Sequence, residues 1–477
     1  MSQKTVLAVD LGAESGRVMA VHFDGSHLQL EELTRFPNTT VVVNNHLHWD
    51  FLRLWHDIQV GIAKGKALQP TSIGVDTWGV DFGLLDKKGD LIANVVHYRD
   101  RRTDGMLEAV FAKVPQAEVF AQTGIQIMAI NTLYQMMSLV EADSPQLTIA
   151  DTLLTAPDLL NYWLTGAKVS EFSIATTTQM LDPRSGKWAT SMLEKLGIPT
   201  HILPEVVPSG TKLGEYDGIP VIAPACHDTG SAVAAVPTQT SDFAYISSGT
   251  WSLFGLEVPQ PVINAASQAA NVTNEGGING SIRLLKNIVG LWIIQQCRKT
   301  WAARGQNYSY AELVTLARQA PPLRSIINVN DPAFVPPGDH PQKVMDFCQR
   351  TAQPIPTTPG EIVRTVLESL ALAYRDVLQT LLTVSGRKAN IIHIVGGGTQ
   401  NELLNQMTAN ATGLPVHTGP IEATVIGNAL VQLIAQGEIS DSIEARGLVA
   451  KMDMISHYEP QGNQAAWDEA YGRFQEI

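Results

Sequence analysis

The sequence predicts an α/β protein built from two domains of related topology, and two observations support this. Apolar strand patterns alternate with helical patterns over 477 residues, and a single hydrophobic core rarely serves more than ~250–300 residues. The segments around Gly12 and Gly249 also share one pattern, in which an apolar strand meets a glycine turn and a second strand. Because these glycines lie about half a chain length apart, the pattern indicates a weak internal repeat.

The expected boundaries follow from the order of these patterns. We expect a first domain at 1–236, a linker at 237–241, a second domain at 241–437 and a C-terminal helical extension at 438–477. Strands are predicted at 6–12, 18–23, 28–36, 73–76, 82–85, 220–224, 243–253 and 391–395. A helix is expected after Asp50, its N-cap, with Leu52, Trp55, Ile58 and Ile62 at helical spacing. Residues 103–200 are expected to be mostly helical, and a long amphipathic helix is expected around 363–381.

Composition argues against several classes of function. The formal net charge is -13 and no run of Lys and Arg occurs, so nucleic acid is not an expected partner. No stretch approaches the ~20 apolar residues of a membrane span, and the short apolar run before Asp10 does not suit a signal peptide. The three cysteines, Cys226, Cys297 and Cys348, are odd in number and form no Cys-x-x-Cys pair. We therefore expect reduced thiols and a cytoplasmic protein with no membrane partner.

Three glycine-containing turns could hold phosphate groups. In Asp10–Arg17 and again in Ser248–Thr250, a glycine hairpin would let backbone N–H groups approach an oxyanion. Asp10 could hold Mg²⁺ through water, although a plain hairpin with a solvated Asp fits the same residues. Gly396–Gly398 lies between a strand and a helix, where backbone can approach a ligand, but such turns also occur without ligands. Neither hairpin is a Walker loop.

Two further segments suggest sugar chemistry. Asp228, between His227 and Thr229, falls at a predicted helix N-terminus, where the helix dipole would keep a catalytic base ionised; Asp is equally a routine N-cap. In Asp76–Asp81 a Trp beside a Gly and two acids is typical of a carbohydrate site, or of a strand turn with a packed Trp. Nearby Tyr98, Asp100 and Arg102 form either a related cluster or a surface ion pair.

Taken together, and in this order over residues of about 5 to 437, these segments resemble the FGGY family of carbohydrate kinases within the actin-like ATPase superfamily. The resemblance implies two actin-like (ribonuclease H-like) domains with a cleft between them. It is closest to the branch that phosphorylates L-rhamnulose, on the residues of six segments: Asp76–Phe82, Tyr98–Asp100, His227–Thr229, Ser247–Ser252, Asn274–Gly277 and Lys286–Trp292. His-Asp-Thr departs from the more glycine-rich base motif of many other members, but the base itself is retained.

The resemblance also implies roles for individual residues. The residues expected to line the ATP phosphates are Ala13, Glu14, Ser15, Gly16, Arg17 and Thr250. Gln295 and Gly397 are expected at the nucleotide, and Asp10 is expected to organise Mg²⁺. The residues expected to contact the sugar are Gly79, His227, Asp228, Thr229 and Asn287. With Asp228 as the base, ATP and L-rhamnulose would give ADP and L-rhamnulose 1-phosphate, a step of L-rhamnose catabolism.

Other functions fit parts of the same pattern. A kinase of this family for another ketose, such as fuculose, xylulose or ribulose, would differ mainly in the Asp76–Asp81 segment. A non-catalytic actin-like ATP-binding module or chaperone would keep the hairpins but needs no sugar site, which Trp78 and the Asp228 turn argue against. A sugar-sensing regulator that had lost catalysis would not need both Asp10 and Asp228. The sequence does not indicate an oligomeric state.

Overall fold

The computed structural model describes residues 3–452 and 455–477, so Met1 and Ser2, and Asp453 and Met454 of the expected C-terminal extension, lie outside the described residues. The contacts divide the chain into two compact units. Unit 1 comprises 1–239, 257–284 and 423–452, and unit 2 comprises 240–256, 285–422 and 453–477. The chain first passes from unit 1 to unit 2 within the segment 237–241. The domain boundaries expected from the sequence stay a prediction, because each unit gathers segments that are far apart along the chain.

The main sheet of unit 1 is mixed, and it carries the first glycine hairpin. Within the described residues its six strands are, in spatial order, β13 (Lys212–Tyr216), β14 (Ile219–Ile222), β6 (Ser72–Thr77), β1 (Lys4–Leu11), β2 (Ser15–Phe23) and β3 (Leu28–Pro37). β1 is antiparallel to β2 and parallel to β6, and β6 is parallel to β14. The first three predicted strands are therefore confirmed as a meander beside a parallel neighbour.

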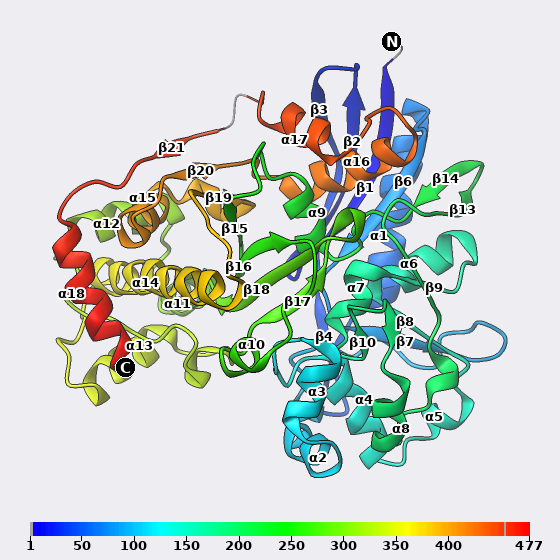
Figure 1. The fold of residues 1–477 in the computed structure, drawn as a ribbon, viewed down its shortest axis with the longest axis horizontal. Coiled ribbons are helices and arrows are strands. Elements are labelled where there is room, and N and C mark those ends of the chain that lie inside the picture. The colour runs from blue at the N-terminus through cyan, green and yellow to red at the C-terminus, as the bar shows by residue number, and fades with distance from the viewer. Residues whose placement is uncertain (1–2, 453–454) are drawn as a thin grey trace. The chain divides into compact units, whose positions relative to one another are not determined.

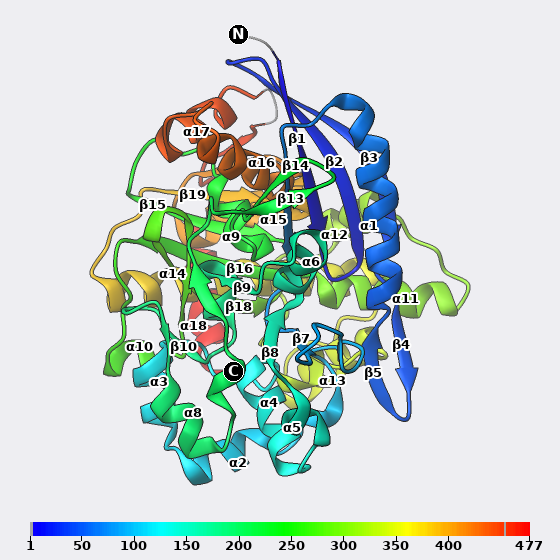
Figure 2. The same cartoon turned by 90° about the vertical axis from the view of Figure 1, so that its right-hand side faces the viewer.

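The two faces of this sheet are covered by different helices, because side chains alternate between faces along a strand. Leu7 and Val9 of β1 share a core cluster with Ile58 of α1 (Phe51–Gly65). On the opposite face, a Cβ added to Gly74 of β6 would meet the Asn428 side chain of α16 (Ala423–Ala435). Figure 2 shows α1 and α16 on opposite sides of the strands. Asp10 and Asp76 have the same parity as Gly74, so they lie on the α16 face.

The remaining elements of unit 1 are short. Its other helices are α2 (Met106–Lys113), α3 (Gln116–Thr123), α4 (Thr132–Glu141), α5 (Pro145–Ile149), α6 (Ala156–Thr165), α7 (Phe172–Thr177), α8 (Thr190–Leu196), α9 (Asp228–Ala234), α10 (Ala265–Ala269) and α17 (Ser442–Val449). Small strand pairs are β4 (Thr40–Val43) with β5 (His46–Trp49), β7 (Phe82–Leu85) with β8 (Thr152–Thr155), β9 (Val169–Glu171) with β12 (Glu205–Val207), and β10 (Leu181–Asp182) with β11 (Lys187–Trp188). Short 3₁₀ turns are η1 (Lys66–Leu68), η2 (Arg101–Thr103), η3 (Thr200–Ile202) and η4 (Ile278–Gly280).

The second sheet lies mostly in unit 2. In spatial order its described strands are β17 (Thr273–Gly276), β18 (Ile282–Val289), β16 (Trp251–Val258), β15 (Phe243–Ser248), β19 (Ile391–Val395), β20 (Val416–Thr418) and β21 (His457–Tyr458). β17 and one end each of β16 and β18 belong to unit 1. The helical segments of unit 2 are α11 (Trp292–Ala303), α12 (Tyr310–Gln319), η5 (Pro332–Phe334), α13 (His340–Arg350), α14 (Pro359–Ser385), η6 (Gly397–Gln400), α15 (Glu402–Thr412) and α18 (Gln464–Gln475). The ribbon in Figure 1 labels most of these elements.

The two sheets repeat one arrangement of strands, as the weak internal repeat predicts. In the second sheet β15 is antiparallel to β16 and parallel to β19, and β19 is parallel to β20. β1, β2, β6 and β14 have the same relations in the first sheet. The two glycine hairpins therefore occupy equivalent positions in their sheets.

Helix patterns were predicted with mixed success. Asp50 is the N-cap of α1, and its carboxylate accepts a hydrogen bond from the backbone N–H of Arg53. Ile58 and Ile62 are buried as expected, but Leu52 is 66% exposed because Phe51 and Leu54 form the buried face instead. The predicted apolar stripe of α14 is confirmed, since every one of its residues is buried: Val363, Val366, Leu367, Leu370, Tyr374, Val377 and Leu381.

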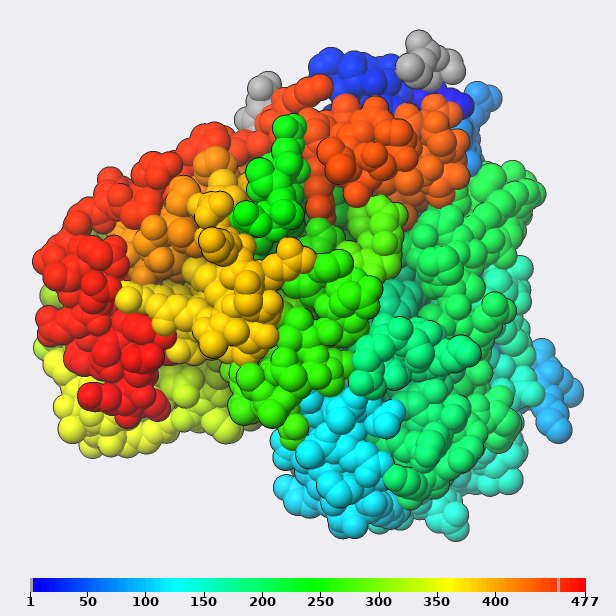
Figure 3. All heavy atoms as spheres, viewed as in Figure 1, coloured from blue at the N-terminus to red at the C-terminus, as the bar shows by residue number. Residues whose placement is uncertain are grey.

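The last part of unit 1 comes from near the end of the chain. In Figure 3 the orange atoms of 423–452 border the dark blue atoms of the first strands, and Lys4 pairs with Glu438 at 2.9 Å. Cys226, Cys297 and Cys348 are buried free thiols. Among the residues that the structure describes, no helix has both the length and the apolar character needed to cross a membrane.

The crossing of α9 and α16 depends on a glycine. A Cβ on Gly427 would lie 1.7 Å from the Ser231 carbonyl oxygen, so Gly427→Ala should force the helices apart. Overpacking of this kind costs roughly 3 kcal/mol, and we expect the first thermal transition to fall by about 5 °C or more. The control is Gly472→Ala in α18, where nothing lies within 4 Å and helix propensity should slightly raise Tm. Equal Tm values for the two variants would contradict this account of the crossing.

Candidate active site

The turn that carries Asp228 is held by buried polar groups from α7. Glu171, the N-cap of α7, is 1% exposed, and its Oε2 accepts hydrogen bonds from the backbone N–H groups of Ser173 and Cys226, each at 3.0 Å. The Ser173 hydroxyl donates to the same oxygen at 2.5 Å and accepts from the backbone N–H of His227 at 3.1 Å. The backbone before Asp228 is thus fixed by one carboxylate and one hydroxyl, neither of which the sequence analysis identified.

Asp228 is the first residue of α9, with His227 as the N-cap. Its Oδ1 accepts from the Thr229 backbone N–H at 2.5 Å and the Thr229 hydroxyl at 3.2 Å, and lies 3.4 Å from Nε2 of His227. Because these contacts converge on Oδ1, Oδ2 is the oxygen suited to accept a proton from a ligand. The side chain is 28% exposed, so a ligand can reach it.

The surroundings of Asp228 act against the expected effect of the helix dipole. Withdrawal from water raises the pKa of Asp228, His227 opposes the rise, and the neighbouring Asp10 adds to it. Burial and the like charge of Asp10 act against the ionised form that a helix N-terminus favours. The carboxylate is therefore a stronger base than an ordinary Asp, which suits proton acceptance.

Two more carboxylates lie beside Asp228. Asp10 of β1 is in register with Asp76 of β6, and Arg17 of β2 is opposite Asp10. Arg17 donates to Oδ2 of Asp10 from Nε at 2.9 Å and from Nη2 at 2.5 Å. Asn428 of α16 donates to Oδ2 of Asp76 at 2.6 Å. Burial, followed by the charges of Asp10 and Asp228, holds the pKa of Asp76 well above its usual range, which favours the neutral form of Asp76 beside the other two.

The first glycine hairpin is braced by the residue that follows β3. Asn38 is 8% exposed, and its Nδ2 donates to the Gly12 carbonyl at 2.9 Å, while its backbone N–H donates to the Glu14 carbonyl at 3.0 Å. A Cβ on Gly16 would lie 2.3 Å from the Phe36 ring. Gly16 is therefore required by packing under the turn, whereas Ala13 and Glu14 form its accessible part.

Of the two interpretations of Trp78, the packed strand turn is the one that fits the structure. Trp78 is 5% exposed and its indole N–H donates to Asp81 at 2.8 Å, so the ring offers no face to a sugar. Asp76 and Asp81 are both fully buried. Gly79 is the partly exposed residue between them.

Val80 has a left-handed backbone, with φ of 69°. This conformation is rare for a β-branched residue and persists only when surrounding contacts hold it. Val80 N–H donates to the Thr177 hydroxyl at 3.2 Å, and the Val80 carbonyl accepts from Thr132 at 2.6 Å and Gln135 at 3.3 Å. The strained turn presents Gly79 beside Thr177, with which a Cβ on Gly79 would make contacts of 3.2–3.3 Å.

Asp81 organises a buried aromatic cluster. Its Oδ2 accepts from the indoles of Trp49 at 2.6 Å and Trp78 at 2.8 Å, and its Oδ1 accepts from Gln135 at 3.1 Å. Gln135 accepts in turn from Arg102 at 2.6 Å. Burial raises the pKa of Asp81 to about 6, although the two indoles and Gln135 oppose the rise.

The segment with Tyr98, Asp100 and Arg102 joins this cluster and is not a surface ion pair. The Tyr98 backbone N–H donates to Asp81 at 3.3 Å, and Asp100, which is 4% exposed, accepts from the Leu47 backbone N–H at 2.6 Å. Of the two alternatives for Tyr98, Asp100 and Arg102, a cluster related to the Asp76–Asp81 segment is the one that fits.

In unit 2 the second hairpin meets the start of α11. Gly249 N–H donates to the Trp251 carbonyl at 2.8 Å, and Gln295 Nε2 donates to the Thr250 hydroxyl at 3.3 Å. Trp292 N–H donates to the Thr250 carbonyl at 3.1 Å. The structure thus brings Thr250 and Gln295 together, as two residues expected at the nucleotide.

The triple-glycine turn packs on the same hairpin. A Cβ on Gly398 would lie 1.9 Å from the Ser248 hydroxyl, and Gly396 has φ of 88°, so both positions require glycine. A Cβ on Gly397 would meet nothing within 4 Å. Gly397 is therefore the open position of the turn, where backbone is accessible to a ligand.

The structure brings together the expected residues of each unit. Unit 1 gathers Asp10, Arg17, His227, Asp228 and Thr229. Asn287 belongs to unit 2, in β18, unlike the other residues expected at the sugar. Among the described residues no cluster of three or more His, Cys, Asp or Glu could by itself hold a metal ion. Sequence patterns had no signal for Asn38, Glu171 or Ser173, because each acts on backbone far away in the chain.

The buried Asp81 predicts an unusual pH dependence of stability. Its folded-state pKa of about 6 exceeds the ordinary 3.8, so its contribution is complete below about pH 4 and is lost as the pH rises through 6. Asp81→Asn carries no such charge and should gain roughly 2–3 kcal/mol relative to the wild type between pH 4.5 and 7. Thermal unfolding at several pH values measures this.

The control for Asp81→Asn is Asp24→Asn. Hydrogen bonds from His27 and Ser26 hold the pKa of Asp24 below its usual range, so its pH dependence lies below pH 4. A difference in Tm between Asp81→Asn and the wild type that stays constant from pH 4.5 to 7 would show that Asp81 has an ordinary pKa.

The chain resembles solved sugar kinases in fold. Gluconate kinase from Lactobacillus acidophilus superposes with a TM-score of 0.79 at 16% identity, covering 100% of this chain and 98% of that one. Glycerol kinase from Plasmodium falciparum superposes with a TM-score of 0.78 at 14% identity, covering 99% and 97%. The predicted fold class, α/β with two actin-like domains, is confirmed.

Sequence comparison identifies the family. Models of the N-terminal and C-terminal domains of the FGGY family of carbohydrate kinases match residues 5–222 and 244–436. A rhamnulokinase from Bacteroides thetaiotaomicron is 44% identical, with 99% of each chain covered. A rhamnulokinase from Oceanobacillus iheyensis is 39% identical, with 94% of this chain and 96% of that one covered. The chain belongs to the FGGY family of carbohydrate kinases.

Proposed function

We propose that this chain transfers the γ-phosphoryl group of ATP to L-rhamnulose, giving ADP and L-rhamnulose 1-phosphate in L-rhamnose catabolism. The sugar is inferred from relatives named rhamnulokinase, which are 39–44% identical over nearly the full length. The observation that carries the chemistry is the geometry of Asp228, whose Oδ1 takes the protein donors while Oδ2 remains for the substrate.

The proposed reaction needs a single base. In phosphoryl transfer the transition state is loose, and the protein contributes mainly position and charge stabilisation. The sugar hydroxyl oxygen bonds to the γ-phosphorus as the bond to the β-phosphate oxygen breaks, and the hydroxyl proton passes to Oδ2 of Asp228. The raised pKa of Asp228 favours this late proton transfer.

We assign residues of the glycine hairpin in each unit to ATP. In unit 1 we assign Ala13, Glu14, Ser15, Gly16 and Arg17 to the phosphates, although Gly16 acts through packing and Arg17 through its pair with Asp10. In unit 2 we assign Thr250, Gln295 and Gly397 to the nucleotide. The hydrogen bond between Gln295 and Thr250 and the open position at Gly397 support that assignment.

Asp10 is the residue that we assign to Mg²⁺. Besides burial, the charges of Asp10 and Asp228 raise the pKa of Asp76, so negative charge collects there, which suits a cation held through water although no three described side chains could ligate it directly. When bound with ATP, Mg²⁺ would neutralise charge on the phosphate oxygens. Asp10 would hold it through water, since Arg17 already occupies Oδ2.

The sugar would be contacted by Gly79, His227, Asp228 and Thr229 from unit 1 and by Asn287 from unit 2. Support differs among these residues. Gly79 is partly exposed, whereas Thr229 is 4% exposed and its hydroxyl already donates to Asp228. We therefore assign Thr229 mainly to orienting the base.

A panel of sugars tests the substrate. With ATP and Mg²⁺, ADP release should show a kcat/KM for L-rhamnulose that exceeds those for L-fuculose, D-xylulose, L-ribulose and glycerol by roughly tenfold or more, because polar groups that face the wrong hydroxyl are left unpaired. A higher kcat/KM for another ketose would assign the chain to that sugar. ATP hydrolysis that is equally fast without sugar would indicate an actin-like ATP-binding module instead.

Asp228→Asn tests the base. The amide keeps the shape of the side chain but cannot accept the proton, so kcat should fall by about 10²–10⁴-fold. The control is Asp143→Asn, at an exposed residue with φ of 46° that Asn adopts readily. A kcat near the wild-type value for folded Asp228→Asn would remove Asp228 from the role of base.

A further inference from the structure

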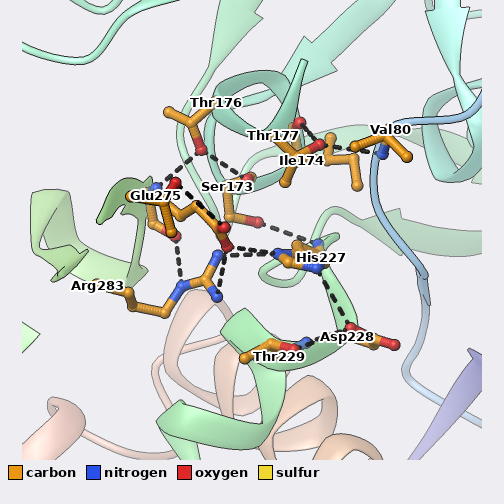
Figure 4. A network of polar contacts seen from close by, with 12 residues as sticks. Val80, Ser173, Ile174, Thr176, Thr177, His227, Asp228, Thr229, Glu275 and Arg283 are labelled. Carbon is orange, nitrogen blue, oxygen red and sulfur yellow. Dashed lines mark hydrogen bonds and ion pairs between the residues drawn. The ribbon is translucent and has the colours of Figure 1, made fainter. Parts of the chain in front are cut away.

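A buried pair of charges lies next to the base turn and has no role in the proposed function. Arg283 of β18 is 0% exposed and Glu275 of β17 is 4% exposed, and both belong to unit 1. Figure 4 shows their side chains converging on His227, which in turn reaches Asp228. Burying two charged groups is costly unless they are paired and hydrogen-bonded, so their contacts identify what they do.

Arg283 is fixed in orientation and directed at the imidazole. Its Nε donates to the Gly276 carbonyl at 2.8 Å, which sets the plane of the guanidinium. Its Nη2 lies 3.0 Å from Nδ1 of His227, and its Nη1 lies 3.2 Å from Oε2 of Glu275. Glu275 therefore balances the charge of Arg283 while Nη2 stays directed at the ring.

These contacts select one tautomer of His227. A guanidinium only donates hydrogen bonds, so the nitrogen that faces Nη2 must offer its lone pair. Nδ1 is then unprotonated, and in the neutral ring the proton sits on Nε2. Nε2 lies 3.4 Å from Oδ1 of Asp228, a long contact of the kind that shortens when substrate binds.

Glu275 offers a competing arrangement. Its Oε2 also lies 3.2 Å from Nδ1 of His227, and a doubly protonated ring could donate to Glu275 and Asp228 together. That arrangement would place the N–H of Nδ1 against the N–H of Arg283 Nη2, which is closer at 3.0 Å. The neutral ring avoids this repulsion because its Nδ1 carries no proton, and Arg283 and Glu275 remain paired with each other.

We propose that Arg283 and Glu275 are positioning residues that hold His227 as its Nε2–H tautomer, so that the imidazole donates to Oδ1 of Asp228 and directs Oδ2 to the sugar hydroxyl. This inference rests on the proposed function only in taking Asp228 as the base. It changes the expected role of His227, whose two ring nitrogens are both engaged within the protein. His227 then supports the base in addition to the place beside the sugar that is assigned to it.

The tautomer is measured directly in the full-length protein. With ¹⁵N-labelled histidine, two-bond ¹H–¹⁵N correlation spectra distinguish the Nε2–H, Nδ1–H and doubly protonated rings, and loss of one signal in His227→Gln assigns it. At pH 7.5 we expect the Nε2–H pattern for His227. An Nδ1–H or doubly protonated ring in the wild type overturns the proposal.

Two substitutions at His227 separate the possible roles. Gln carries an N–H₂ near the position of Nε2 and can still donate to Asp228, whereas Asn reaches only the position of Nδ1 and can still accept from Arg283. We expect the kcat of His227→Gln to exceed that of His227→Asn by roughly tenfold, the worth of one hydrogen bond to a charged group, with similar KM for the sugar. Equal kcat values, or a rise in KM without loss of kcat, would overturn the positioning role.

The buried pair is tested by removing both charges together. Arg283→Met with Glu275→Gln leaves no unpaired buried charge, and it should abolish the preference for the Nε2–H tautomer and lower kcat by about tenfold. The control is Arg304→Met, at a residue that is 52% exposed and pairs with Asp339; it should change neither. An unchanged tautomer in the folded double variant overturns the role of Arg283.

Failure of the proposed function would look different. An active Asp228→Asn enzyme with the Nε2–H tautomer intact would remove the base and leave the His227 geometry standing. An inactive Asp228→Asn enzyme in which His227 has another tautomer would keep Asp228 as the base and remove the proposed role of Arg283 and Glu275.

Discussion

The crowding of three carboxylates at the ends of β1 and β6 and at the start of α9 is the constraint on which the site depends. Parallel pairing in register puts Asp76 beside Asp10, and the base turn adds Asp228. Carboxyl groups that lie close together in a poorly solvated place cannot all ionise. Each of the three therefore has a different partner. Arg17 forms an ion pair with Asp10. Asn428 donates a hydrogen bond to Asp76, and burial raises the pKa of Asp76. Thr229 donates a hydrogen bond to Asp228.

The same constraint explains why so many buried polar groups surround the turn. A carboxylate held near other carboxylates moves away unless its backbone is fixed, and here Glu171 and Ser173 hold the backbone of residues 226 and 227. Glu171 also caps α7, so a helix terminus and the base turn share one acceptor. Arg283 and Glu275 extend the support to the imidazole of His227. Rigid support of this kind keeps a base in reach of its proton.

Elements with strong local signals were predicted well, and buried polar side chains were not. The cap at Asp50, the stripe of α14 and both glycine hairpins follow from spacing and composition alone, and the structure has all of them. The Trp78 segment fitted either a carbohydrate site or a strand turn with a packed Trp, and the structure has Trp78 buried against Asp81. An exposed Trp and Asp can bind a sugar, whereas a buried Trp and Asp bind each other. Whether they are buried depends on residues such as Gln135 that are distant along the chain. The roles assigned to individual site residues stay predictions.

The sequence by itself determined the fold class, the repeated hairpins and the identity of Asp228 as the candidate base, because these depend on local periodicity, turn residues and the order of motifs. Only the tertiary structure decided how Asp228 is supported. His227 is its neighbour in the chain, but Arg283 and Glu275, which set the state of the imidazole, come from strands about 50 residues later. A tautomer is chosen by the donor that faces the ring, and strand pairing and burial, not local sequence, bring that donor into place.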